Sequence, residues 1–299
     1  MIELPKGVDL QSLLLFLKRL GCKSSSMLRD FESESILLYK SPESSEQNHN
    51  EKDLVTAADL ELNKLITEDF LINFPNIKWE IVTEENAKNE PHSRYQSNSE
   101  WTWFVDPLDG TRDFVQKSGE YAVHLGLIFK NKPILGMVLL PSLKELWFGV
   151  NGIGTWVESE DISLKKKEFE NIPSSDPIKV LTSKNHNNSK LEFILREMDF
   201  KNVVRMGSIG FKVCNLLKNQ ADIYLSISDK TSPKHWDIAA PHALLDNSRC
   251  NFTYASGENI NYQQKDYLQE GCLIASTLSN KEHLNICKNV NTIIKEFDL

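Results

Sequence analysis

The chain has 299 residues, of which 40% are hydrophobic and 25% are charged, so it is long enough to bury a sizeable core in one large domain or two lobes. Its formal net charge of -8 argues against non-specific nucleic-acid binding, which requires a basic surface. Because it has neither a signal-peptide pattern nor an apolar run of the ~20 residues that span a membrane, we expect a cytoplasmic protein without a transmembrane segment.

The cysteines are odd in number and include no C-x-x-C pair, so they indicate neither a disulfide framework nor a zinc site. We expect buried or idle thiols at all of these positions. The five residues are Cys22, Cys214, Cys250, Cys272 and Cys287.

The first predicted element is a helix over Leu10–Leu20, which is apolar on nearly every side and has Asp9 as its N-cap. We expect Gly21 to end or weaken this helix, and Ser24–Tyr39 to be a helical continuation. Ser41–Glu51 is polar and contains no core residue, so a mobile loop is expected there. Whether the loop is a plain surface insertion or a lid stays open.

A second helix is predicted after Thr56, where apolar residues recur at helical spacing, namely Leu62, Leu65, Ile66 and Phe70. Asp59 then lies near the beginning of this helix, where the helix dipole favours an acid. Capping by Asp53, Thr56 or Asp59 explains these residues without any catalytic role. Further along, Ile77–Val82 is a predicted strand that ends at a pair of acids, Glu84 and Glu85, which alone would indicate only a solvated loop.

The segment from Trp101 combines a buried strand with acids, a proline and a glycine. Trp101–Val105 is aromatic and β-branched, and Pro107 and Gly110 are expected to stop the strand and force a tight turn. Asp106 and Asp109 therefore lie at the carboxyl end of a strand, where open α/β architectures bind ligands. Two carboxylates this close need a counter-cation or a shared proton, and magnesium takes oxygen ligands of this kind.

Four apolar runs follow and are separated by turn signals, which predicts an antiparallel meander over Tyr121–Phe129, Pro133–Leu140, Lys144–Val150 and Gly154–Val157. Glu158–Pro177 then loses its apolar content and is the expected lobe boundary. We predict an N-terminal α+β lobe over residues 1–165 and a C-terminal α/β lobe over residues 166–299.

Strands and helices alternate in the second part, which indicates an α/β layer. The predicted strands are Ile178–Leu181, Asn202–Arg205, Ile223–Ile227 and Gly271–Ala275. The predicted helices are Lys190–Met198, Phe211–Leu217, Trp236–Leu245 and a last one through Ile294 that opens with a capping box at Ser279–Glu282.

Asp106-Pro-Leu-Asp-Gly-Thr111 resembles the D-P-[IL]-D-G-[ST] signature of the inositol monophosphatase superfamily. Three further stretches resemble the same family in the same order, namely Asp53-Leu-Val-Thr-Ala-Ala-Asp59, Val82-Thr-Glu-Glu85 and Trp236-Asp-Ile-Ala-Ala240. Gly207-Ser-Ile-Gly-Phe-Lys212, His186 and the segment Tyr121–Trp156 look most like the CysQ-type branch, the 3'(2'),5'-bisphosphate nucleotidases. One departure is Thr83, which stands where the family motif has Gly or Ser before the paired acids.

The resemblance implies a five-layer αβαβα sandwich that binds two or three Mg²⁺ ions. The implied metal ligands are Glu84, Asp106, Asp109, Asp237 and the Leu108 carbonyl. Thr111, polarised by Asp59, is implied to orient the attacking water, while the Gly110 and Thr111 amides hold the phosphate. The implied contacts to the second phosphate and the ribose are His186, Ser208 and Lys212. Without the resemblance, Asp237 is explained equally well as a helix cap, and Ser208 has a helix cap as its alternative role. The alternatives for Lys212 and His186 are a solvated lysine and a surface histidine.

The expected function is lithium-sensitive, magnesium-dependent removal of the 3'(2')-phosphate from 3'-phosphoadenosine 5'-phosphate, giving AMP and phosphate and linked to sulfate assimilation. The expected partners are a small phosphorylated substrate and at most a second copy of the chain. An inositol or other sugar phosphate is the nearest rival substrate, because Asp53-Leu-Val-Thr56 looks more like the inositol monophosphatases. A haloacid-dehalogenase-type phosphatase is disfavoured, since its acids are spaced D-x-D. A non-catalytic scaffold that binds metal or phosphate is the remaining alternative.

Overall fold

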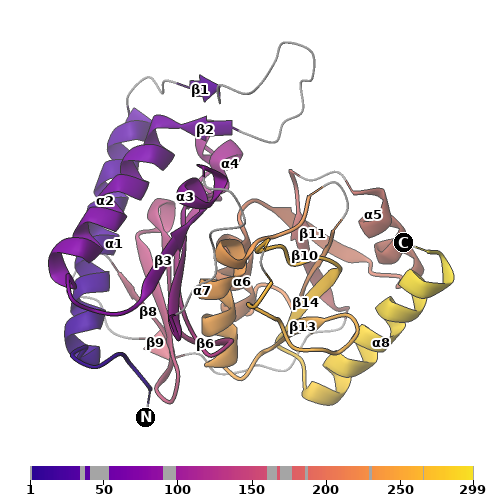
Figure 1. Cartoon of the computed structure of the whole chain (residues 1–299). Coiled ribbons are helices and arrows are strands. Elements are labelled where there is room, and N and C mark those ends of the chain that lie inside the picture. The colour runs from indigo at the N-terminus through magenta and orange to yellow at the C-terminus, as the bar shows by residue number, and fades with distance from the viewer. Residues whose placement is uncertain are drawn as a thin grey trace.

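The computed structural model describes residues 2–33, 38–40, 54–89, 99–159, 167–168, 177–185, 188–228, 231–264 and 266–298. Within these ranges the chain forms five layers, in which helices and sheets alternate (Figure 1). The layer helices are α1 (Leu10–Ser33) and α2 (Ala57–Asn73) on one outer side, α6 (Ile209–Leu217) and α7 (His235–Asp246) in the middle, and α5 (Ser189–Glu197) and α8 (Asn280–Glu296) on the other outer side. The predicted αβαβα sandwich is confirmed.

The first sheet has seven strands in the order β3-β4-β5-β6-β7-β8-β9. Neighbours from β4 to β9 are antiparallel, whereas β3 runs parallel to β4. The predicted meander is therefore confirmed. The strands are β3 (Glu80–Thr83), β4 (Trp101–Asp109), β5 (Ala122–Phe129), β6 (Lys132–Leu140), β7 (Glu145–Val150), β8 (Gly154–Ser159) and β9 (Lys167–Glu168).

The second sheet has five strands in the order β11-β10-β12-β14-β13. β10 runs parallel to both of its neighbours, and β14 is antiparallel to both of its own. The strands are β10 (Lys179–Ser183), β11 (Asn202–Met206), β12 (Ile223–Ile227), β13 (Asn251–Tyr254) and β14 (Cys272–Ser276). All of them except β13 were predicted, and the capping box that opens α8 at Ser279 is also confirmed.

Short elements occupy the connections between the layers. α3 (Glu84–Asn89) and α4 (Thr111–Val115) each follow a strand of the first sheet, and η2 (Pro141–Leu143) is a 3₁₀ turn between β6 and β7. β1 (Leu38–Lys40) and β2 (Leu54–Thr56) form an antiparallel pair. α3 begins at the predicted site residue Glu84, and α4 follows Asp106 and Asp109, so both strands continue at the predicted site directly into helical turns.

The prediction that Gly21 ends or weakens the first helix is wrong. Asp9 caps α1 as expected, since its carboxylate accepts from the Ser12 amide at 2.9 Å, but the helix runs through Gly21 to Ser33. A Cβ at Gly21 would lie 2.3 Å from Leu146 Cδ2, so the glycine here lets α1 pack closely on the sheet. The predicted continuation is right up to Ser33, whereas Leu38–Lys40 is a strand.

A row of three glycines crosses the first sheet and holds α7 close to it. Gly136 of β6 pairs with Gly126 of β5 on one side and with Gly149 of β7 on the other. A Cβ on any of them would come within 2.5 Å of a backbone atom of α7, at Ala240 or Ala243. Any side chain in this row would therefore push α7 outward.

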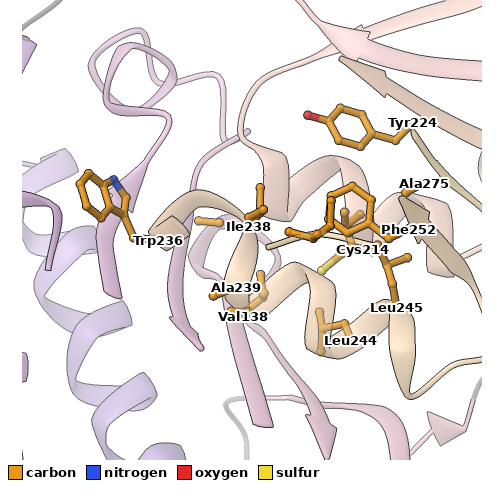
Figure 2. Packing of buried hydrophobic residues seen from close by; sticks show 14 of the residues in the cluster. Val138, Cys214, Tyr224, Trp236, Ile238, Ala239, Leu244, Leu245, Phe252 and Ala275 are labelled. Atoms are coloured by element: carbon orange, nitrogen blue, oxygen red, sulfur yellow. The ribbon is translucent and has the colours of Figure 1, made fainter. Parts of the chain in front are cut away.

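α7 also contributes to the core between the two sheets (Figure 2). Buried side chains of this core come from α7 (Ile238, Ala239, Leu244, Leu245), β6 (Val138), α6 (Cys214) and the second sheet (Tyr224, Phe252, Ala275). Because α7 contacts both sheets, it fixes their distance and its own depth at the same time.

Some predictions concern residues that lie outside the described ranges, namely the 41–52 loop, Asp53 and His186. The division into lobes at residues 165 and 166 stays a prediction. The five cysteines all lie within the described residues, and none of them forms a disulfide. Among the described residues, no helix is both long and apolar enough to cross a bilayer.

Candidate active site

Four predicted metal ligands lie at the ends of three neighbouring elements. Asp106 and Asp109 lie in the last part of β4, Glu84 begins α3 directly after the parallel neighbour β3, and Asp237 lies in the first turn of α7. Burial and then the charges of Glu84, Asp109 and Asp237 raise the pKa of Asp106 well above its usual range. Burial, followed by Asp109 and Glu84, raises the pKa of Asp237 to about 8. The sequence-distant carboxylates therefore share one electrostatic environment, which we call the carboxylate site.

The end of β4 differs from the predicted stop at Pro107. The strand continues to Asp109, and its pairing register with β5 shifts between Asp106 and Asp109. A proline is tolerated at such an irregularity because it has no amide to donate to the ladder. Gly110 makes the expected turn with a φ of 89°, which favours glycine, and serves as the N-cap of α4.

Each of the four carboxylates has a donor within the protein. The Leu108 amide donates to Asp106 Oδ1 at 2.9 Å, the Ile209 amide to Asp109 Oδ2 at 2.6 Å, and the Lys234 amide to Asp237 Oδ2 at 2.7 Å. Glu84 Oε1 instead pairs with Lys88 Nζ at 3.0 Å. The four donors thus come from four different parts of the chain, and only one of them carries a charge.

In the described part of the chain, no three acidic, histidine or cysteine side chains already surround one point as the ligands of one cation do. Burial and then the charges of the neighbouring acids raise the pKa of both Asp106 and Asp237. Without a cation between them, carboxylates repel one another and turn toward other donors, as these do toward backbone amides. Four carboxylates with the Leu108 carbonyl beside them form an all-oxygen donor set, which fits a hard cation such as Mg²⁺.

Asp59 connects the start of α2 to the start of α4. Its Oδ2 accepts from the Thr56 amide at 2.8 Å and from the Thr56 hydroxyl at 2.6 Å, which completes a capping box. Its Oδ1 accepts from the Thr111 hydroxyl at 3.1 Å. Burial raises the pKa of Asp59 to about 6. The Asp59 carboxylate therefore both caps α2 and contacts Thr111, two roles that the sequence analysis treated as alternatives.

The predicted substrate contacts that the structure describes are engaged within the protein. The Ser208 hydroxyl is the N-cap of α6 and accepts from the Phe211 amide at 2.9 Å. The Lys212 ammonium donates to the Gly207 carbonyl, and its side chain is buried against the Tyr224 ring. Burial lowers the pKa of Lys212 to about 8. Contact of Ser208 and Lys212 with a substrate stays a prediction.

Sequence reasoning missed His124, which lies against Asp109. Its Nε2 is 3.5 Å from Asp109 Oδ2, and its ring is fully buried. Burial lowers the pKa of His124, so the ring is neutral beside the carboxylate near pH 7. The available signal was a single ionisable residue within the otherwise apolar strand β5.

An ion-pair network on the other side of α4 was also missed. Lys184 Nζ lies 2.6 Å from Asp113 Oδ1 and 2.7 Å from Glu120 Oε2, the Asn185 amide group donates to Asp113, and the Gly207 amide donates to Glu120. A Cβ at Gly207 would lie 2.5 Å from Asp113 Oδ2, so only glycine fits there. This α4 network, of Asp113, Glu120, Lys184, Asn185 and Gly207, joins α4 to the loops after β10 and β11. Its partners are far apart in sequence, so no local pattern marks them.

Comparison with known proteins gives one family model, described as the inositol monophosphatase family, that matches residues 10–295. A curated relative, the 3'(2'),5'-bisphosphate nucleotidase CysQ of Salmonella typhimurium, is 28% identical over 212 residues, which are 71% of this chain and 80% of the relative. The protein of the same name from Buchnera aphidicola is 30% identical over 210 residues, 70% of this chain and 74% of the relative.

Solved structures show the same fold. CysQ from Bacteroides thetaiotaomicron superimposes with a TM-score of 0.69 at 21% identity and covers 90% of this chain and 98% of its own. An IMPase/NADP phosphatase complexed with Mg²⁺ and phosphate gives a TM-score of 0.71 at 19% identity and covers 92% of this chain and 95% of its own. The five-layer arrangement is thus shared over nearly the whole chain.

Proposed function

Because the chain belongs to the inositol monophosphatase family, we propose that it is a Mg²⁺-dependent phosphomonoesterase that removes the 3'(2')-phosphate from 3'-phosphoadenosine 5'-phosphate. The observation that carries the proposal is the hydrogen bond from the Thr111 hydroxyl to Asp59, which joins two predicted motifs beside the carboxylate site. The cytoplasmic location, the lithium sensitivity and the link to sulfate assimilation belong to the same proposal.

The carboxylates of Glu84, Asp106, Asp109 and Asp237, with the Leu108 carbonyl, would hold two or three Mg²⁺ ions. Bound magnesium supplies the positive charge that neutralises phosphate oxygens and stabilises the leaving oxygen. An acidic chain has particular need of such charge, since its formal net charge is -8. The backbone amides at Asp106, Asp109 and Asp237 fix the direction of each carboxylate.

Thr111 and Asp59 form the water-orienting pair of the proposal. The Thr111 hydroxyl donates a hydrogen bond to Asp59, so a lone pair on the threonine oxygen remains to accept a hydrogen bond from water. The second Asp59 oxygen is held by Thr56, and this contact fixes the carboxylate in place. The Gly110 and Thr111 amides, at the start of α4, would hold the transferred phosphate.

The nucleotide preference is the finer part of the proposal. It is supported by the likeness to curated bisphosphate nucleotidases at 28% and 30% identity. The resemblance of His186, Ser208 and Lys212 to residues of that branch also supports it. A sugar-phosphate preference is the second candidate, since Asp53-Leu-Val-Thr56 looks more like the inositol monophosphatases.

The test is phosphate release with Mg²⁺ from the nucleotide bisphosphate, inositol 1-phosphate and fructose 1,6-bisphosphate, measured side by side. We expect the highest kcat/KM on the nucleotide. Lys212→Ala should reduce this rate far more than the rate on inositol 1-phosphate, because the loss falls on a part of the substrate that only the nucleotide carries. A higher kcat/KM on inositol 1-phosphate would favour the second candidate. Tight Mg²⁺ binding without release from any of the three would favour a scaffold.

A further inference from the structure

The four acids of the carboxylate site are held by two kinds of donor. Asp106, Asp109 and Asp237 each accept from a backbone amide, which is neutral and orients the carboxylate without repelling a cation. Glu84 is paired with the ammonium of Lys88. A donor with a full positive charge competes with a metal ion for the same carboxylate, which a neutral amide does not.

Lys88 reaches Glu84 along the same short helix. The two residues are four apart in α3, with the acid nearer the N-terminus, which is the favourable order for such a pair. The same ammonium lies 3.3 Å from Glu85 Oε1, whose side chain is almost entirely buried. The Lys88 side chain is about one third exposed, so it keeps room to move.

We propose that Lys88 is an internal counter-cation of the carboxylate site, which holds Glu84 until a divalent cation takes its place and then rests on Glu85. The inference rests on the proposed function, because it takes Glu84 as a metal ligand. It adds a residue that lowers metal affinity and, in exchange, stabilises the protein when no metal is bound.

The charge balance explains why such a residue is useful. Like-charged carboxylates that lie close together repel one another and destabilise the folded protein, and one positive charge against Glu84 offsets part of that cost. The ammonium and a divalent ion would repel each other if both stayed on Glu84. Lys88 already contacts the Glu85 carboxylate, which is not a predicted metal ligand, so its ammonium can remain paired with Glu85 when a cation occupies Glu84.

The test measures binding of Mn²⁺ alone to chelator-treated protein by calorimetry, together with thermal melting without metal. Lys88→Met should bind Mn²⁺ about two- to fivefold tighter than the wild type, a range set by the usual strength of partly exposed ion pairs. It should also melt at a lower temperature without metal. Lys88→Arg keeps the charge and should behave like the wild type in both measurements.

Lys218→Met is the matched control, because Lys218 pairs with Glu145 at 2.7 Å with similar exposure. Lys218 lies at the C-cap of α6, the opposite end of that helix from Ser208. Lys218→Met should lower the melting temperature of the metal-free protein and leave its Mn²⁺ affinity unchanged. Lys88→Gln replaces Lys88→Met if the latter fails to fold. Unchanged or weaker Mn²⁺ binding without the lysine charge would overturn the inference, whereas absence of binding in the wild type would overturn the proposed function.

Discussion

The carboxylate site and the α4 network lie on either side of one short helix and use the same residue type in opposite ways. Asp109 precedes α4 and faces backbone amides and a neutral His124, whereas Asp113, four residues later, is fully buried against Lys184. The network supplies its own cation and thereby joins distant loops. In the carboxylate site one acid, Glu84, is paired with a lysine, Lys88, whereas Asp106, Asp109 and Asp237 accept from backbone amides, so charge is left for a ligand to neutralise.

The largest effect on the carboxylate site is expected from removing one of its carboxylate charges. Asp237→Asn should abolish Mg²⁺-dependent turnover, because the cation loses a ligand. The pKa of Asp237 rises from 3.8 to about 8 on folding, so its stabilising contribution is present below about 4 and is lost as the pH rises through 8. Metal-free wild type should therefore melt at a lower temperature at pH 9 than at pH 6, and its free energy of unfolding should be lower at pH 9 by on the order of a few kcal/mol.

In the Asp237→Asn protein this pH-dependent loss should shrink, and at pH 9 without metal the variant should be the more stable of the two. Differential scanning calorimetry at both pH values measures the effect. Near wild-type turnover at the same Mg²⁺ concentration would contradict the ligand assignment, and parallel melting curves would contradict the raised pKa.

Substitutions of Thr111 test whether its hydroxyl orients the attacking water beside the carboxylate site, a role that no residue of the α4 network is proposed to have. Thr111→Ala should lower kcat by about 10²- to 10⁴-fold, and Thr111→Ser, which keeps the hydroxyl, should retain much of the rate. If Thr111 only offers its backbone amide to phosphate, alanine preserves that amide and changes little. Asp59→Asn should resemble Thr111→Ala, and the double variant should lose clearly less than the product of the two single losses. Independent losses would show that Asp59 acts only as a helix cap or on the metal.

The smallest effect on catalysis is expected from a change in the α4 network, where the acids are already paired with a lysine. Lys184→Met should destabilise the protein by about 1–3 kcal/mol, because it leaves the buried Asp113 without its cation while Lys184 itself is partly exposed. Turnover should fall less than about tenfold, the step of roughly 1.4 kcal/mol in a barrier. Lys201→Met, which removes an ion pair to Asp199 with both side chains largely exposed, should leave melting unchanged within about 1 kcal/mol. Urea unfolding of both variants measures the difference, and equal stabilities would show that the α4 network does not hold the molecule together.

How much the sequence predicts depends on how local the cause is. The apolar runs and turns of β5 to β8, the capping box at Ser279 and the turn at Gly110 all depend on neighbouring residues, and the structure has them where they were expected. The predicted end of the first helix is wrong because Gly21 allows close packing against Leu146, which lies on a strand distant in sequence. Local propensity gave no way to distinguish a helix stop from a close contact.

The same limit applies to the candidate site. Asp106, Asp109 and Glu84 were predicted because short motifs carry them, and the structure brings them together with Asp237. Lys184 and Gly207 were missed because their partners, Asp113 and Glu120, lie more than sixty residues away. Lys88 was missed for a different reason, since a lysine four residues after an acid is common on exposed helices.

The row of glycines under α7 has a consequence for the order in which the molecule assembles. β5, β6 and β7 pair with their sequence neighbours, and such local pairing forms early. Asp237 leaves the ribosome more than a hundred residues after Asp109, a delay of roughly ten seconds at ordinary rates of synthesis. Until α7 docks, the glycine row would lie uncovered on the first sheet. Glu84, Asp106 and Asp109 would then lack Asp237, the fourth acid of the carboxylate site. The chain would therefore acquire its full metal affinity as one of its last folding events, so metal binding during refolding would report completion of the fold.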